Sequence, residues 1–359
     1  MSTLRVTAER LTIHPHPDAD ALELAQVGLF RAVVAKGAYR TGDWAVYVPE
    51  NALLPDDLIG ELGLTGRLAG SARNRVKAVR LRGELSQGIV CRPARLAGVD
   101  LASAHGEGTD FAADLGITKW VPEVPLHMSG ELVAAPDLMR WIEVENVKRH
   151  PDAFEPGERV VATEKIHGTA CLFTLVARTG EGFVSSKGHG SRDFALAPAD
   201  DNLYWRAVAA HGVREAAREV ADRFGAARVG VFGEVFGAGV QDLAYGESGR
   251  SARPGYAVFD IALDIGGART WIDAVDLPGV LDAVGLPAAP VLYDGPYDEA
   301  ALTAVARGAE TWSGSGLHMR EGAVVRPARE RASGVLRGRA IAKFVSEAYL
   351  TRKGGTEYE

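Results

Sequence analysis

The chain has 359 residues, of which 47% are hydrophobic, a formal net charge of −7 and only two cysteines, Cys91 and Cys171. Its length suits two domains rather than one, and its hydrophobic content excludes general disorder. Two cysteines exclude a disulfide framework and a thiolate metal site, and the acidic balance disfavours broad nonspecific nucleic-acid binding while allowing local basic tracks.

Residues 1–96 show the pattern of a small β-domain. Strands are predicted at 45–49, 75–82 and 88–91 from their β-branched residues and alternation, with turn-rich connectors at 14–20 and 36–43. No apolar run is long enough for a membrane span, and the N-terminus lacks the apolar stretch of a signal peptide. From the strand pattern we expect an OB-type β-barrel in this region. We also expect a cytoplasmic protein with no membrane partner and no obligate protein partner.

Two tracks along the chain are basic. Residues 67–82 hold six Lys or Arg and no acidic residue, and residues 318–353 hold nine against three Glu. Each track can be a solvated strand face or a contact for phosphates. On the first, we predict that a basic strand on the barrel contacts nucleic acid through Arg75, Lys77, Arg80 and Arg82.

Residues 97–137 lack periodicity and carry prolines after Trp120, so we predict a connector there. From residue 138 onward the pattern is α+β. One amphipathic helix is expected over 201–224, ended by Gly225, and another over 298–307. The predicted organisation is therefore an OB-like domain at 1–96, a connector at 97–137 and a catalytic domain at 138–359.

Six short motifs follow one another within the predicted catalytic domain. They are Glu164-Lys165-Ile166-His167-Gly168-Thr169, Ser185-Ser186-Lys187-Gly188, Phe232-Gly233-Glu234-Val235-Phe236-Gly237, Tyr256-Ala257-Val258-Phe259-Asp260, Glu321-Gly322-Ala323-Val324-Val325-Arg326 and Ala340-Ile341-Ala342-Lys343-Phe344. Each alone is weak evidence. Together, on predicted strands and turns, they indicate one active site.

Lys165 is the candidate nucleophile. An amine with an ordinary pKa of about 10.4 must lose its proton before it attacks phosphorus, and burial or neighbouring cations favour that loss. Lys165 ends a predicted apolar strand and precedes a turn closed by Gly168, which places it at a pocket mouth. We expect Lys187, Arg326 and Lys343, with a divalent metal, to supply the cationic surroundings.

The six motifs resemble those of the covalent nucleotidyltransferases, which comprise ATP-dependent DNA and RNA ligases and RNA capping enzymes. Histidine two residues after the lysine is similar to the RNA ligases. The resemblance implies an ATP-grasp-like domain of antiparallel sheets with flanking helices. It also implies that Lys165 attacks the α-phosphate of ATP, releases pyrophosphate and forms lysyl–AMP.

The resemblance further assigns roles to residues of the motifs. The implied catalytic residues are Lys165, His167, Glu234, Glu321 and Lys343. The implied nucleotide contacts are Glu164, Gly168, Lys187, Phe259, Asp260, Arg326 and Lys343. Glu234 and Glu321 would hold Mg²⁺ or Mn²⁺, and Phe259 would stack on adenine.

Alternatives remain for three of these residues. His167 could cap backbone groups of its turn, Glu234 could form a buried salt bridge, and Phe259 could be an ordinary core residue. The last motif also departs from the two lysines usual in similar RNA ligases, because Ile341 stands where the first would be. On a continuous strand Arg339 would share a face with Ile341 and Lys343 and could supply that cation.

The chain ends 16 residues after Lys343, so we expect no OB domain after the catalytic domain. The preceding barrel, the segment 141–147, the motif around Lys165 and the ending 343–349 together are similar to the Deinococcus-type RNA ligases. That resemblance implies sealing of 3′-OH/5′-phosphate nicks in duplexes whose 3′-OH strand is RNA. The alternatives are an ATP-dependent DNA ligase and a nonenzymatic tRNA-binding module.

Overall fold

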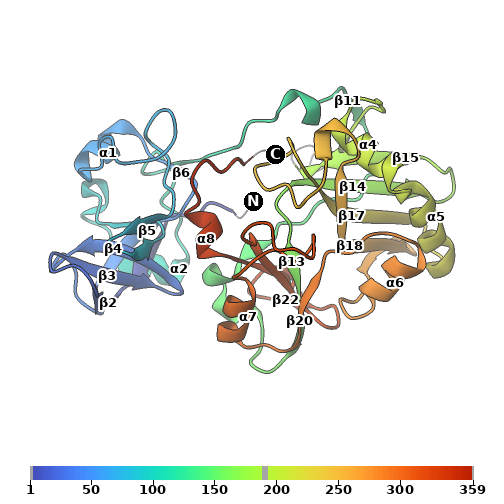
Figure 1. The fold of residues 1–359 in the computed structure, drawn as a ribbon. Helices are drawn as coiled ribbons and strands as arrows, with labels where there is room; N and C mark the ends of the chain where they lie inside the picture. Colours follow the sequence, from blue (N-terminus) through green and yellow to red (C-terminus); the bar gives the residue numbers. More distant parts are fainter. Residues whose placement is uncertain (1–2, 188–192, 358–359) are drawn as a thin grey trace. The chain divides into compact units, whose positions relative to one another are not determined.

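The computed structural model describes residues 3–187 and 193–357, and the chain divides into two compact units, residues 1–121 and 122–359 (Figure 1). Gly188 of the second motif lies outside the described residues. No helix in the described ranges is long and apolar enough to cross a membrane. Sheets that are antiparallel except for the pairing of β12 with β24, together with separate helices, make up the two units, which confirms the predicted α+β class.

The N-terminal unit is built from short strands. They are β1 (Thr7–Arg10), β2 (Thr12–Pro15), β3 (Leu22–Val27), β4 (Phe30–Ala35), β5 (Trp44–Val48), β6 (Ala52–Leu53), β7 (Val79–Leu81), β8 (Glu84–Ser86), β9 (Ile89–Cys91) and β10 (Thr118–Lys119). The helices are α1 (Asp56–Glu61), α2 (Leu101–Glu107) and the 3₁₀ turn η1 (Ala94–Leu96). Two three-stranded sheets, β1-β5-β9 and β2-β3-β4, form its main layers.

The apolar core of this unit extends beyond residue 96. Val46 and Val48 of β5 pack with Phe111, Leu115 and Ile117, all of them buried. Residues 97–121, which the sequence pattern assigns to a connector, thus belong to the N-terminal unit.

The predicted strand over 75–82 is wrong in most of its length. Only β7 (Val79–Leu81) is a strand, and it pairs with β8 (Glu84–Ser86) through a tight turn. Arg82 and Gly83 occupy that turn with φ of 50° and 89°, the left-handed pair typical of a two-residue hairpin. The basic residues therefore do not lie along one strand face.

The C-terminal unit contains two larger sheets. Its strands are β11 (Leu132–Ala134), β12 (Glu145–Asn146), β13 (Arg159–Lys165), β14 (Thr169–Val176), β15 (Gly182–Ser186), β16 (Phe194–Leu196), β17 (Arg228–Phe236), β18 (Gly255–Ile265), β19 (Ala268–Trp271), β20 (Val291–Pro296), β21 (Gly322–Pro327), β22 (Ala332–Ser333), β23 (Gly338–Arg339) and β24 (Ala342–Val345). One sheet has the order β11-β16-β15-β14-β17-β18-β19 and the other β12-β24-β21-β13-β20.

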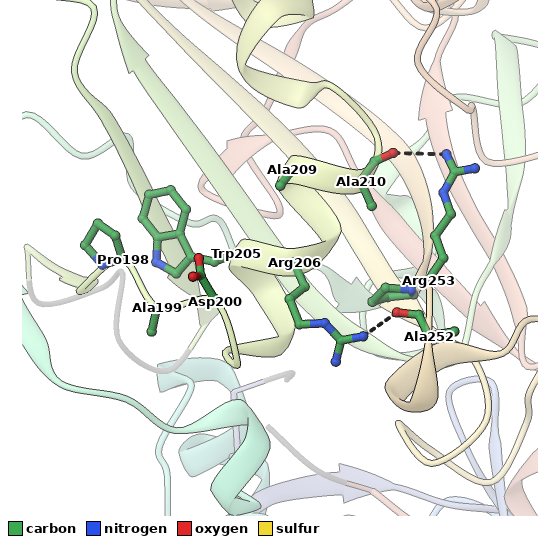
Figure 2. A pocket seen from close by; sticks show the side chains of 10 residues that line it. Pro198, Ala199, Asp200, Trp205, Arg206, Ala209, Ala210, Ala252 and Arg253 are labelled. Carbon is green, nitrogen blue, oxygen red and sulfur yellow. Dashed lines mark hydrogen bonds between the residues drawn. The ribbon is translucent and has the colours of Figure 1, made fainter.

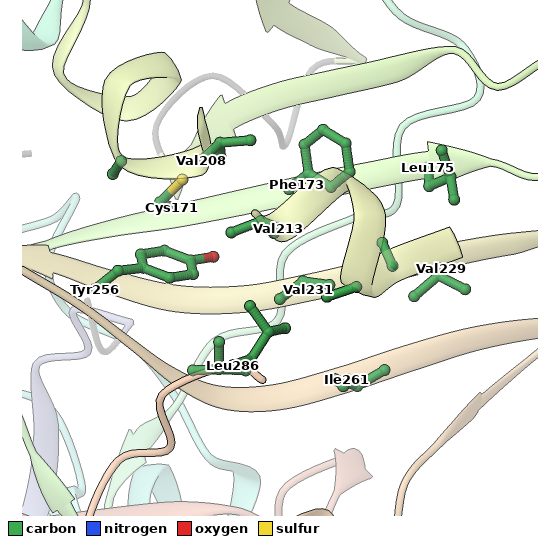
Figure 3. Close-up of a cluster of buried hydrophobic side chains, with 14 of the residues drawn as sticks. Cys171, Phe173, Leu175, Val208, Val213, Val229, Val231, Tyr256, Ile261 and Leu286 are labelled. Carbon is green, nitrogen blue, oxygen red and sulfur yellow. The ribbon is translucent and has the colours of Figure 1, made fainter. Parts of the chain in front are cut away.

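Helices cover parts of these sheets. They are α4 (Leu203–Ala210), α5 (Val213–Phe224), α6 (Leu277–Ala283), α7 (Glu299–Val305) and α8 (Glu347–Leu350), with 3₁₀ turns η2 (Leu126–Met128), η3 (Val147–Arg149), η4 (Pro151–Ala153) and η5 (Gly249–Ser251). Figure 3 shows the main core, which includes Phe173 of β14, Val231 of β17, Ile261 of β18 and Val213 of α5. Val229, Val231 and Val235, alternate residues of β17, face this core.

The single helix predicted over 201–224 is two helices. Gly212 adopts φ of 61°, a left-handed conformation that an α-helix does not continue through, so α4 ends and α5 starts anew. The predicted end at Gly225 is confirmed, since that glycine caps α5 in the left-handed region. The helix predicted over 298–307 is α7, capped by the side chain of Asp298.

Candidate active site

The predicted motifs meet where the chain crosses from one sheet of the C-terminal unit to the other. Lys165 is the last residue of β13 and lies opposite Gly322 at the start of β21. Four residues later the chain enters β14 at Thr169, opposite Val235 of β17. Strand pairing thus brings together motifs that lie far apart in the sequence.

Gly168 makes this crossing possible. A Cβ atom there would lie 2.2 Å from the backbone oxygen of Val235, so any side chain would push β14 away from β17. The same close approach lets the Gly168 backbone reach the Glu234 carboxylate as a hydrogen-bond donor. Gly168 therefore has a steric role that needs no ligand.

Lys165 forms an ion pair with Glu321. Its Nζ lies 2.8 Å from Glu321 Oε1, and a quarter of its side chain is exposed. Burial favours the neutral amine, but the Glu321 and Glu234 carboxylates outweigh it and hold the pKa of Lys165 above its ordinary value. This differs from the expectation that neighbouring cations lower the pKa of Lys165, because the closest groups are anionic.

The amine whose pKa the structure lowers is that of Lys343, not that of Lys165. Lys343 lies on β24 opposite Val324 of β21, and burial together with the Lys165 and Lys187 ammonium groups lowers its pKa to about 7. Lys187 follows β15 and contacts Glu143 Oε2 at 2.9 Å. The three lysines of the predicted set therefore lie near enough to influence one another.

The two predicted metal carboxylates differ in charge state. Burial raises the pKa of Glu234 to about 7, although Lys165 opposes the rise. Burial acts in the same sense on Glu321, but Lys165 and His167 outweigh it and bring the pKa of Glu321 down to about 2. Glu321 is thus the more readily ionised carboxylate of the two, and burial favours the neutral form of Glu234.

These carboxylates fit one mode of metal binding. Within the described ranges, no group of three or more His, Cys, Asp or Glu is placed to hold a metal ion. Glu321 Oε2 is buried and has no hydrogen-bond donor within bonding distance among the described residues. Mg²⁺ is commonly held by one or two carboxylates, its own waters and substrate phosphates. Glu321 and Glu234 suit that arrangement and do not form an all-protein cage.

His167 is buried and held by side chains. Its Nε2 lies 2.8 Å from Asp242 Oδ1, and its Nδ1 lies 3.0 Å from Tyr349 Oη and 3.7 Å from Glu321 Oε2. Burial would lower the pKa of His167, but Asp242 and Glu321 outweigh it and raise that pKa. The alternative that His167 caps its own turn does not fit these partners.

Phe259 occupies a β-bulge. Phe232 of β17 lies opposite Asp260, while Gly233 lies opposite Val258, so Phe259 is the extra residue on β18. A bulge re-aims the side chain that it carries. Phe259 is only partly buried and contacts two apolar clusters, which suits a platform for a flat ligand as well as packing.

Glu164 has partners of its own. Its Oε2 accepts a hydrogen bond from Thr311 N at 2.9 Å and lies 3.8 Å from Arg320 Nε. The carboxylate is enclosed, and burial raises its pKa. Glu164 thus ties β13 to the segment around Thr311, and its predicted nucleotide contact gains no support from this position.

Asp260 and Arg326 form a buried ion pair with each other, and their predicted contact with nucleotide stays a prediction. Arg326 Nη1 lies 2.8 Å from Asp260 Oδ1, and both residues are only 1% exposed. Arg339 also binds Asp260, pairs with Glu330 and stacks on Trp271 at 4.0 Å. As placed here, neither Asp260 nor Arg326 presents an accessible charge.

Arg339 therefore does not replace the missing lysine of the last motif. The expected continuous strand is interrupted at Ala340 and Ile341, between β23 and β24. Ile341 is buried, and its backbone N–H bonds to Arg339 O. With Arg339 committed to Asp260 and Glu330, Lys343 is the cation that this motif contributes.

The predicted basic residues of the N-terminal unit divide into two kinds. Arg75 is buried, stacks on Trp120 at 3.2 Å and donates to Asn51 Oδ1, so its role is structural. Lys77 is partly exposed, while Arg80 and Arg82 are exposed on the β7–β8 hairpin. The last three keep the predicted phosphate contact as an expectation.

A surface groove of about 760 Å³ lies beside α4 (Figure 2). Arg206 donates to Ala252 O and Arg253 donates to Ala210 O, so both arginines fasten the loop at 249–254 to the helix. None of the predicted site residues lines this groove. We therefore place the chemistry at the crossing of the two sheets.

Sequence reasoning missed several residues that surround His167. Tyr245 Oη accepts from His167 N at 2.7 Å, and Asp242, Tyr349 and Arg352 contact the ring. Tyr349 lies in the segment 343–349, which contributes to the resemblance to the Deinococcus-type RNA ligases. Asp242 and Arg352 carried no motif, and only folding brings them to residue 167.

Comparisons with known proteins agree with this architecture. A family model described as RNA ligase matches residues 158–345, and one described as an OB-fold domain matches residues 5–93. The second match confirms the predicted OB-fold at the N-terminus. None of the curated proteins compared with the chain matches it.

Solved structures of an RNA ligase from Naegleria gruberi are similar to the chain along nearly its whole length. A variant with AMP and Mn is 24% identical, with a TM-score of 0.76 and coverage of 96% of this chain and 97% of that one. A variant with ATP and Mn is 24% identical, with a TM-score of 0.77 and coverage of 96% and 98%. The protein with PPi is 23% identical, with a TM-score of 0.76 and coverage of 97% and 98%. This likeness establishes the fold.

Proposed function

Because the chain belongs to the RNA ligase family, we propose that it is an ATP-dependent RNA ligase that works through lysyl–AMP and AMP–polynucleotide intermediates. The observation that carries the proposal is the grouping of Lys165, Glu321 and His167 at the crossing between the sheets, with Lys343 and Glu234 acting on the same lysine. This group of side chains supplies one amine nucleophile, two carboxylates and a second amine of lowered pKa.

In this scheme Lys165 Nζ must shed a proton and turn from Glu321 to the α-phosphate of ATP. The phosphorus–nitrogen bond forms as the bond to pyrophosphate breaks. A divalent cation held by Glu321 and Glu234 would neutralise triphosphate charge and would weaken the pull of both carboxylates on the ammonium. Lys343, with a pKa of about 7, is then a candidate to accept the proton or to contact phosphate.

The choice of ATP and of Mg²⁺ or Mn²⁺ has a second support. The similar Naegleria gruberi structures hold ATP, AMP and Mn, and we extend these ligands to this chain as part of the proposal. Phe259, re-aimed by its bulge, would stack on the adenine ring. Lys187 would lie along the phosphates.

The finer proposal is a Deinococcus-type enzyme that seals 3′-OH/5′-phosphate nicks in duplexes whose 3′-OH strand is RNA. Its support is the order of the domains, with the OB-fold before the catalytic unit, and the motif around Lys165. The nucleic-acid contacts would include Lys77, Arg80 and Arg82 on the N-terminal unit. An ATP-dependent DNA ligase is the alternative within the same chemistry.

Nick sealing tests this finer proposal. The full chain is given ATP, Mg²⁺ and duplexes that differ only in the 3′-terminal sugar at the nick. We expect sealing with ribose at the 3′ end and much slower sealing with deoxyribose. Equal rates at both ends would favour the DNA-ligase alternative, and RNA binding without any adenylylation would favour a nonenzymatic RNA-binding protein.

A further inference from the structure

Asp242 accepts hydrogen bonds from two directions. On one side, His167 Nε2 lies 2.8 Å from its Oδ1. On the other, Arg352 Nε lies 2.9 Å from Oδ2, and Thr356 N lies 2.9 Å from Oδ1. The Asp242 carboxylate therefore joins the histidine of the first motif to a segment almost 190 residues further along the chain.

These contacts fix which ring nitrogen of His167 faces Glu321, the carboxylate paired with Lys165. A carboxylate accepts hydrogen bonds and donates none, so Nε2 must carry the proton that bonds to Asp242. The other nitrogen, Nδ1, is then the one turned toward Tyr349 Oη at 3.0 Å and Glu321 Oε2 at 3.7 Å. In histidine sites, the partner of one nitrogen sets the role of the other.

The terminal segment is itself well fixed. The Arg352 guanidinium stacks on the Tyr349 ring at 3.6 Å and donates to Tyr349 O. Thr356 Oγ1 bonds to Gln241 Oε1 at 2.9 Å, and Gln241 Nε2 bonds to Gly168 O at 3.0 Å. Residues 349–356 and 241–242 thus hold the turn at 167–168 through a chain of hydrogen bonds.

We infer that Asp242 is a positioning residue for His167, and that Arg352 and Thr356 hold Asp242 in place for that task. The clamp orients the imidazole so that Nδ1 faces Glu321, the carboxylate paired with Lys165. Its catalytic consequence rests on the proposed function. Its structural part, the fixed protonation of Nε2, stands independently of it.

The kinetic test uses the full chain and measures covalent labelling by labelled ATP. Asp242→Ala is expected to lower the labelling rate at saturating ATP about 10–100-fold, with a change of less than about 3-fold in the half-saturating ATP concentration. Thr356→Ser, which keeps the hydroxyl, should label at close to the normal rate, and Thr356→Val should label several-fold more slowly.

A matched control separates positioning from general damage. Asp294→Asn removes a carboxylate that also accepts two hydrogen bonds from an arginine, here Arg159, but at an exposed site on β20. It should label normally. The inference is overturned if Asp242→Ala labels at more than half the normal rate, or if Asp294→Asn loses as much.

A spectroscopic arm does not depend on ligase activity. In ¹⁵N-histidine-labelled protein, the His167 signals, identified by their loss in His167→Asn, should show a protonated Nε2 in the native chain and a changed pattern in Asp242→Ala, which removes the acceptor. Unchanged ring signals would overturn the clamp. If the native chain takes no label from ATP, the proposed function fails, and this arm alone decides the inference.

Discussion

Replacing Lys343 with methionine should stabilise the protein while removing its activity. The folded structure lowers the pKa of Lys343 from 10.5 to about 7. Between those two values the unfolded chain binds more protons than the folded one, so this lysine makes stability rise with pH. At pH 7 it is therefore a cost to folding that methionine would not carry.

The size of that cost follows from the pKa change. At about 1.4 kcal/mol for each pKa unit, the cost at pH 7 is at most about 4 kcal/mol. Because water reaches part of the side chain, we expect about 1–3 kcal/mol, or a rise of several degrees in Tm. The gain should shrink by up to about 2 kcal/mol between pH 7 and pH 9, where less of the penalty remains.

The assay is thermal unfolding of Lys343→Met and the native chain without nucleotide at both pH values, with adenylylation measured in parallel. We expect labelling to fall at least about 100-fold while Tm rises at pH 7. A variant that is less stable than the native chain at pH 7 would refute the reasoning. An equal gain at both pH values would also refute it, because packing rather than charge would then be the cause.

Three further predictions follow from the same geometry. Phe259→Leu should raise the half-saturating ATP concentration about 5-fold or more by removing ring stacking, and unchanged ATP dependence would make Phe259 a core residue. Asp260→Asn should destabilise the chain by about 3 kcal/mol or more in denaturant titration, because two buried arginines lose a charge partner. Loss of ATP affinity without destabilisation would instead indicate that Asp260 contacts the nucleotide. A fragment from residue 122, which keeps the buried Met128, should form lysyl–AMP but seal nicks poorly. Neutralising Lys77, Arg80 and Arg82 together should reduce the slope of log binding constant against log salt concentration by up to about 3 for nicked duplex.

The sequence allowed the general plan to be predicted because that plan rests on local signals. The ordered motifs indicated one active site, and Lys165, Glu321 and Lys343 lie close enough in the structure to influence one another. Gly225 marked the end of α5. Gly212 carried a similar signal for the break before α5, but the apolar periodicity on either side concealed it.

The rest depended on contacts that no local pattern contains. Asp260 lies 66 residues from Arg326 and 79 from Arg339, so only folding shows that their charges serve each other. The charge state of Lys165 depends on the distance to Glu321 after β13 and β21 pair. Arg75 similarly looks like a surface cation until Trp120 covers it.

The most direct test of the central claim is transfer of AMP to Lys165. The native chain is incubated with Mg²⁺ and ATP labelled at the α-phosphate, beside Lys165→Ala and Lys165→Arg. We expect an acid-labile covalent label on the native chain and none on either variant, since arginine stays protonated at working pH. Persistent label on Lys165→Ala would rule out Lys165 as the nucleophile, because another residue would then carry the AMP.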